Sequence, residues 1–127
     1  MKILITGNLG YVGSIVERHL RLAHPDATIV YAHNDEMALG AITAIEAAGK
    51  VPGKDILVVS IDGEKDAVQA IIDGKLGATC ECNPRFGPAS FDIMMKYANG
   101  EKIPPLNINP DRFFDASNAK EMLATAF

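Results

Sequence analysis

Residues 55–61 read Asp-Ile-Leu-Val-Val-Ser-Ile, and Asp62-Gly63 follows directly before a helical pattern over residues 64–73. A continuous apolar run of this length is typical of a parallel strand that is covered on both faces. Aspartate and glycine are turn residues, and the helical pattern ends at Gly74, where glycine favours a C-terminal cap. This stretch therefore predicts one strand–turn–helix unit of an α/β fold.

The same alternation repeats along most of the chain. Further strands are predicted over residues 2–6, 28–32 and 78–82, and further helices over residues 11–23, 36–48 and 86–99. Strand–helix repetition with right-handed crossovers predicts one α/β domain over residues 1–127, with an open, mainly parallel sheet of about four to five strands. Helices on both faces would give a three-layer, Rossmann-like or flavodoxin-like α/β/α architecture.

The last quarter of the chain has a different pattern. Ile103-Pro104-Pro105 prevents a helix from continuing, and residues 106–108 are expected to form an edge strand. Ser117 is expected to cap a short last helix over residues 118–126.

The composition excludes several classes of protein. Of 127 residues, 48% are hydrophobic and 22% are charged, which is typical of a folded domain and not of a disordered chain. Twelve Lys and Arg against sixteen Asp and Glu give a net charge of −4, without a basic cluster that could follow a nucleic-acid backbone. No apolar run approaches the roughly 20 residues of a membrane span, and the first residues lack a signal-peptide pattern. We therefore expect a cytoplasmic protein that contacts neither nucleic acid nor membrane.

The chain has two cysteines, Cys80 and Cys82. Two positions apart in a strand, their side chains would be nearly parallel and badly placed for a disulfide. With no second cysteine pair or nearby histidine, we expect no metal site here, only small, half-buried thiols.

A glycine-rich turn follows the first predicted strand and opens the first predicted helix. Its sequence over residues 7–13 is Gly-Asn-Leu-Gly-Tyr-Val-Gly. With the strand before it, this stretch resembles the N-terminus of extended short-chain dehydrogenase/reductases of the nucleotide-sugar epimerase type, over residues 1 to about 30. The resemblance implies contacts to a dinucleotide from Gly7, Gly10, Tyr11, Val12 and Gly13. Alternatively, the glycines only make a tight strand-to-helix turn.

Two departures from that reductase family argue against oxidoreductase activity. The family needs a Tyr-x-x-x-Lys pair, but the residues four positions after the three tyrosines are Ile15, Asp35 and Glu101. Asp35 stands about where the family has its ribose-binding acid, although in foreign surroundings. We therefore predict that the chain is not an enzyme and binds NAD at most weakly.

Three strand-end motifs in the rest of the chain carry a second resemblance. Residues 33–41 read His-Asn-Asp-Glu-Met-Ala-Leu-Gly-Ala, residues 59–63 read Val-Ser-Ile-Asp-Gly and residues 81–84 read Glu-Cys-Asn-Pro. In this order they resemble the C-terminal lobe of periplasmic sugar-binding proteins of the ribose and galactofuranose type, from about His24 to the end.

That resemblance implies a set of sugar-binding residues. Asn34, Asp62 and Asn83 would direct amide and carboxylate groups at sugar hydroxyls from the carboxyl ends of the strands, where ligands of open α/β sheets bind. Alternatively, two of these residues act only locally: Asn34 caps the helix over residues 36–48, and Asp62 forms a turn with Gly63. His24 and His33 are expected to be solvated or capping residues, and Arg85 a solvated residue at a helix start.

The two resemblances together favour an engineered chimera without catalytic activity, with a reductase-like strand–helix unit joined to a binding-protein lobe within residues 24–32. The alternatives are a weak carbohydrate-binding module, acting through the three strand-end residues, and a nucleotide-binding module that uses the glycine loop.

Strand counting also predicts a homodimer. Successive right-handed crossovers place the helices over residues 11–23, 36–48 and 64–73 on one face of the sheet. Only the helix over residues 86–99 and the last helix would remain for the opposite face. An incompletely covered face favours a dimer that exchanges the segment after Pro104-Pro105, or a monomer whose last helix folds over that face.

Overall fold

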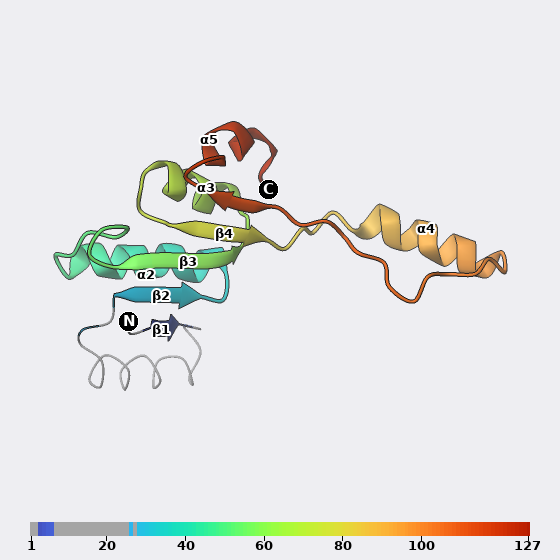
Figure 1. The fold of residues 1–127 in the computed structure, drawn as a ribbon, viewed down its shortest axis with the longest axis horizontal. Helices are drawn as coiled ribbons and strands as arrows, with labels where there is room; N and C mark the ends of the chain where they lie inside the picture. Colours follow the sequence, from blue (N-terminus) through green and yellow to red (C-terminus); the bar gives the residue numbers. More distant parts are fainter. Residues whose placement is uncertain (1–2, 7–25, 27) are drawn as a thin grey trace.

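The structure is a computed structural model that describes residues 3–6, 26 and 28–127. Its core is a five-stranded sheet in the order β1-β2-β3-β4-β5 (Figure 1). The strands are β1 (Ile3–Thr6), β2 (Ile29–Ala32), β3 (Leu57–Asp62), β4 (Ala78–Glu81) and β5 (Phe113–Asp115). Strands β1 to β4 are parallel, and β5 is antiparallel to β4. The predicted open, mainly parallel α/β sheet is confirmed.

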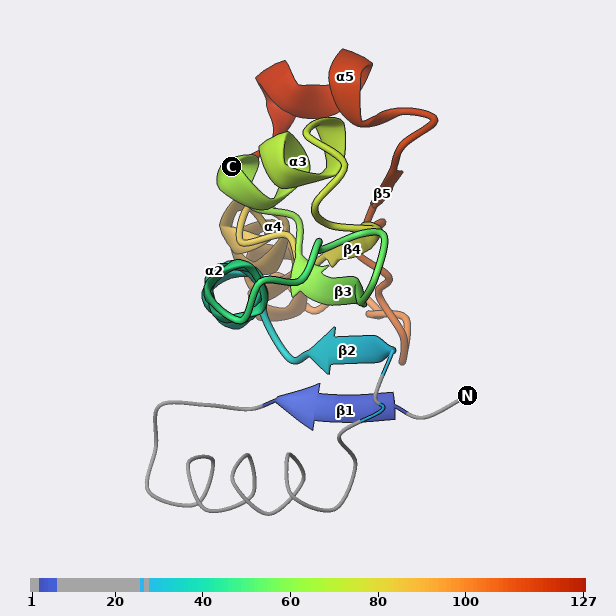
Figure 2. The same ribbon diagram turned by 90° about the vertical axis from the view of Figure 1, so that its left-hand side faces the viewer.

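Among the described residues, two helices cover one face of this sheet. They are α2 (Asp35–Ala47) and α3 (Lys65–Ile72), and Figure 2 shows both on the same side of the stacked strands. The strand residues facing them are buried, namely Val30, Ala32, Val58, Ser60, Thr79, Glu81 and Phe114. The two helices share one hydrophobic core with this face of the sheet. Because the crossovers are right-handed and advance in one direction, these two helices fall on one face, as predicted. The third helix predicted for this face, over residues 11–23, lies outside the described residues.

The predicted edge strand over residues 106–108 is wrong. Leu106 and Ile108 are 72% and 79% exposed, and neither belongs to a strand. The edge strand is β5, which places Phe114 against α3 with no exposed surface. Burying this large side chain stabilises the edge position, whereas the apolar residues at 106 and 108 have no core to enter.

The last helix also differs from the prediction. It consists of α5 (Ala119–Met122) followed by a 3₁₀ turn (Leu123–Thr125), and Asn118 occupies the N-cap position expected for Ser117. The Ser117 hydroxyl instead donates a hydrogen bond of 2.6 Å to the Asp115 carboxylate. Helix α5 packs beside α3 and Phe114, so it extends the helical layer and does not fold over the opposite face of the sheet.

Helix α4 (Gly87–Ala98) matches the predicted helix over residues 86–99 but not its expected position. It projects far from the sheet on an extended connection, and none of its residues is buried (Figure 1). Neither α4 nor α5 therefore covers the second face, and the three-layer arrangement is not completed by the described residues. No described helix combines the length and the apolar character that a membrane span requires.

Candidate functional site

The three predicted sugar-binding residues lie at one edge of the sheet. Asn34 comes two positions after β2, Asp62 is the last residue of β3, and Asn83 comes two positions after β4. Because these strands are parallel neighbours, their carboxyl ends meet at the same edge. The structure thus brings all three residues to the part of an open α/β sheet where ligands bind.

Asn34 caps helix α2, as predicted from its place before a helical pattern. Its side-chain oxygen Oδ1 accepts a hydrogen bond of 2.8 Å from the backbone N–H of Met37, and its own backbone is extended. The cap satisfies one of the free N–H groups of the first helical turn. It also fixes the direction of the side chain, so the amide is presented in one orientation at the edge of the sheet.

Asp62 occupies a strained position. Its φ of 138° lies in the region that favours glycine, and Gly63 follows with a φ of 81°. A Cβ atom on Gly63 would lie 2.8 Å from the Phe114 ring and 3.1 Å from the Glu81 Cα, so glycine is required there. Burial, followed by the charge of Asp35, raises the pKa of the Asp62 carboxyl. Strained backbone of this kind is frequent at functional sites.

Asp35 is the centre of a buried hydrogen-bond network behind this edge. Its carboxylate has no exposed surface and accepts hydrogen bonds from the Ser60 hydroxyl, from the Thr79 hydroxyl at 2.8 Å and from the Glu64 N–H at 2.7 Å. The Thr79 oxygen in turn accepts a hydrogen bond of 3.2 Å from the Gly63 N–H. Asp35 is therefore not placed to bind the ribose of a dinucleotide, as the acid of the reductase family does, because protein donors enclose its carboxylate. Instead, Asp35 ties α2, β3, β4 and α3 together.

Asn83 shapes the chain where it leaves the sheet. Its Oδ1 accepts a hydrogen bond of 2.8 Å from the Arg85 N–H, and its own N–H donates to the Asp111 carboxylate at 3.2 Å. The first contact is a local turn of the Asx type. The guanidinium of Arg85 lies 5.9 Å from the ring centroid of Phe127, so Arg85 contacts the C-terminal residue in addition to solvent.

An ion pair that the sequence did not reveal lies beside Asn83. The Arg112 guanidinium donates from Nε at 2.9 Å and from Nη2 at 2.5 Å to the two carboxylate oxygens of Glu81. These hydrogen bonds lower the pKa of Glu81, which is almost fully buried. Arg112 also donates to the Thr125 hydroxyl at 2.6 Å and lies 5.0 Å from the Phe114 ring centroid. The pair joins the end of β4 to the start of β5.

The sequence of this domain matches the family described as "Periplasmic binding protein domain" over residues 14–102. That match covers more than half of the chain. The chain belongs to the periplasmic binding protein family.

Several relatives of this chain are named for sugars. The galactofuranose-binding protein YtfQ of Escherichia coli is 43% identical over 96 residues, which are 75% of this chain and 30% of that protein. The ribose import binding protein RbsB of Salmonella typhimurium is 44% identical over 92 residues, 72% of this chain and 30% of that protein. The chain therefore spans about a third of the length of these curated relatives, which are named as binding proteins and not as enzymes.

Solved structures agree with this family assignment. A Mycobacterium smegmatis protein described as a complex with β-D-fucofuranose has a TM-score of 0.77 and 44% identity, covering 87% of this chain and 36% of that one. A second Mycobacterium smegmatis structure has a TM-score of 0.76 and 42% identity, covering 94% of this chain and 41% of that one.

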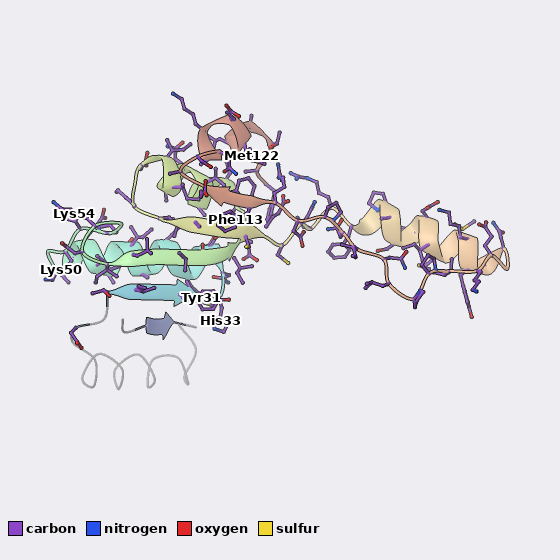
Figure 3. All side chains as sticks on the ribbon, in the orientation of Figure 1. Tyr31, His33, Lys50, Lys54, Phe113 and Met122 are labelled. Carbon is purple, nitrogen blue, oxygen red and sulfur yellow. The ribbon has the colours of Figure 1, made fainter. Side chains whose placement is uncertain are left out.

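The remaining residues singled out from the sequence have different outcomes. His33 is exposed beside Tyr31, with ring centroids 5.3 Å apart, as Figure 3 shows at the end of β2. Cys80 and Cys82 are free thiols and are exposed, not half-buried. The glycine-loop residues Gly7, Gly10, Tyr11, Val12 and Gly13, together with His24, lie outside the described residues, so dinucleotide binding stays a prediction.

Proposed function

We propose that the carboxyl edge of this sheet is one wall of a carbohydrate-binding site, with Asn34, Asp62 and Asn83 as the residues that contact sugar hydroxyls. The observation that carries the proposal is the gathering of these three side chains at one edge in a chain whose relatives are named for ribose, galactofuranose and related sugars. Amide and carboxylate groups both fit vicinal hydroxyls, which donate and accept hydrogen bonds. The function is recognition without catalysis.

The expected affinity follows from the number of contacts. One wall leaves a bound sugar open to water, so each hydrogen bond contributes only about 1 kcal/mol. Three such contacts give at most roughly 3 kcal/mol, and the freedom lost on association reduces this further, so we expect a dissociation constant well above about 10 mM. Binding by this chain alone should therefore escape detection at a few millimolar sugar.

A titration followed by ¹⁵N-resolved NMR tests this proposal. Ribose, arabinose and galactose are added from about 1 mM to about 100 mM. The expected result is a set of chemical-shift changes confined to the strand ends, which appear only above a few millimolar and are lost in Asp62→Asn. The matched control is Asp73→Asn, since Asp73 is an exposed carboxylate outside this edge. Shifts spread evenly over the protein, or unchanged in Asp62→Asn, would contradict the proposal.

We also propose that the first strand–helix unit derives from a different parent, of the reductase type, and that the chain has no reductase activity. The support is the glycine-rich turn over residues 7–13, which precedes the start of the family match at residue 14, and the missing Tyr-x-x-x-Lys pair. Incubation with NAD⁺ and nucleotide sugars should give neither NADH absorbance nor an epimerised product. Turnover that depends on protein concentration would contradict this.

A further inference from the structure

The turn between β3 and α3 is held from behind by the side chain of Asp35, the first residue of α2. Its carboxylate oxygen Oδ2 accepts a hydrogen bond of 2.7 Å from the Glu64 N–H. The other oxygen, Oδ1, accepts a hydrogen bond of 2.8 Å from the Thr79 hydroxyl, and the Thr79 oxygen accepts one of 3.2 Å from the Gly63 N–H. The two N–H groups that follow Asp62 are therefore both connected to one carboxylate, that of Glu64 directly and that of Gly63 through Thr79.

The backbone of Asp62 requires support of this kind. Its φ of 138° is a conformation that a residue other than glycine keeps only where the surrounding structure over-determines it. On one side, the Asp62 carbonyl accepts a hydrogen bond of 2.8 Å from the Cys82 N–H, just after β4. On the other side, the N–H groups of Gly63 and Glu64 are anchored to the buried carboxylate. Hydrogen bonds on both sides of Asp62 thus fix its Cα–Cβ direction and the place of its carboxylate at the edge of the sheet.

The same contacts fix Asp62 relative to Asn34. Asn34 caps the first turn of α2, and Asp35, which anchors the turn after β3, is the next residue. Burial and the charge of Asp35 raise the pKa of Asp62, while a hydrogen bond from the Asp35 backbone lowers it, so the two carboxylates are close neighbours. The side chains of Asp35 and Thr79 have no exposed surface. They cannot touch a bound sugar and can act on it only through Asp62.

We propose that Asp35 and Thr79 are positioning residues of the carbohydrate-binding edge, which set the direction of the Asp62 carboxylate and its place relative to Asn34. This inference rests on the proposed function, because the placement of Asp62 matters only if Asp62 contacts the sugar. A hydrogen bond weakens steeply as its angle falls toward about 120°, so a turn that relaxes from its strained φ would lose the sugar contact without losing the fold. The alternative is that the buried network only stabilises the domain.

Variants of Thr79 separate these two roles better than Asp35→Asn, because that substitution also leaves buried groups in the core without their partners. Thr79→Val keeps the shape of the side chain but removes the hydroxyl that joins Gly63 to Asp35. Thr79→Ser keeps the hydroxyl and removes a buried methyl group, which lowers stability. Ser60→Ala is the matched control, since the Ser60 hydroxyl donates to the same oxygen of Asp35 but is not part of the link to Gly63.

Two NMR measurements follow the turn and the site in these variants. The hydrogen-exchange rate of the Gly63 N–H, divided by that of the core N–H groups of β3, should rise at least about tenfold in Thr79→Val, because its acceptor is gone. The initial slope of the strand-end chemical shifts against ribose or arabinose concentration should fall at least about fivefold in Thr79→Val. In Thr79→Ser and Ser60→Ala both quantities should stay within about twofold of the native values, although urea unfolding should show both variants to be less stable.

The pattern across the variants decides between positioning and general stabilisation. A sugar response that falls in Ser60→Ala and Thr79→Ser as much as in Thr79→Val would show that the network only supports the fold, and would overturn the proposal. Native shifts that are lost in Asp62→Asn but kept in Thr79→Val would contradict the positioning role alone. If the native protein shows no strand-end shifts up to about 100 mM sugar, the carbohydrate site itself fails, and the positioning role fails with it.

Discussion

Replacing the buried carboxylate at Asp35 by an amide should destabilise the protein strongly. The carboxylate accepts three hydrogen bonds, from the hydroxyls of Ser60 and Thr79 and from the N–H of Glu64. In Asp35→Asn one acceptor oxygen becomes an NH₂ group, which faces at least one of these donors. An unsatisfied buried donor costs about 1–3 kcal/mol, and hydrogen bonds to a charged group are worth more than neutral ones. We therefore expect the free energy of unfolding to fall by about 2–4 kcal/mol, a large part of the 5–15 kcal/mol typical of a domain.

Urea unfolding followed by far-UV circular dichroism, at one fixed protein concentration, measures this loss. The control is Asp73→Asn, because Asp73 is exposed and its side-chain oxygen accepts a hydrogen bond from Gln69 that asparagine can also accept. That variant should change stability by less than about 0.5 kcal/mol. If Asp35→Asn changes stability as little as the control, the buried network does not stabilise the fold through these hydrogen bonds.

A double-mutant cycle with Thr79→Val separates the contact itself from general damage to the core. Thr79 donates to Asp35 and accepts from Gly63, while valine has nearly the same shape without the hydroxyl. Because the two residues share a hydrogen bond, the double variant should lose less stability than the two single variants added together. A coupling below about 0.5 kcal/mol would show that Asp35 acts through its other two partners.

Three further perturbations test separate features. Gly63→Ala should lower the free energy of unfolding by about 2–4 kcal/mol in chemical unfolding, since the φ of Gly63 is 81° and the added Cβ meets Phe114. Gly40→Ala is the control: Gly40 lies in α2 with open space around it, so alanine should stabilise the helix. Because the pKa of Glu81 is lowered in the folded protein, its ionised carboxylate stabilises the fold at pH values above the ordinary glutamate pKa. This stabilisation is lost as the pH falls through the folded-state pKa. In thermal melts, the melting temperature should therefore fall less between about pH 6 and pH 3 in Glu81→Gln than in the native protein. Equal falls would rule out a stabilising role of the ionised Glu81 carboxylate. Calorimetry should find NAD⁺ binding no tighter than about 0.1–1 mM, whereas a micromolar constant that Gly10→Val abolishes would show a working dinucleotide site.

The strand–helix units were predictable because each one carries its own local signals. The apolar run before Asp62-Gly63 became β3, and the pattern after it became α3, since burial and turn chemistry act within a few residues. Strand β5 was missed because it has only three residues and gains its stability from Phe114, whose core contacts come from elements far away in the sequence. A short antiparallel strand of this kind depends on its neighbours more than on its own pattern.

The residues of the candidate site also differ in how far local sequence predicts their roles. Asn34 was predicted both as a cap and as an edge residue, because both follow from its position after a strand and before a helix. The roles of Asp35 and of the Glu81–Arg112 pair were not predictable. Asp35 reaches residues 25 and 44 positions away, and Glu81 and Arg112 are 31 positions apart. An acidic residue in a first helical turn is expected to face solvent, and only the packed structure shows that this one is enclosed.

Helix α4 shows why an amphipathic pattern predicts a helix better than it predicts a partner. The spacing of Phe91, Met94 and Met95 requires some apolar surface to cover these side chains, but it is equally compatible with the same sheet, a second copy or another lobe. Outside the helix, the Glu81–Arg112 pair and the Asn83–Asp111 contact join the two connecting segments where they leave and re-enter the sheet.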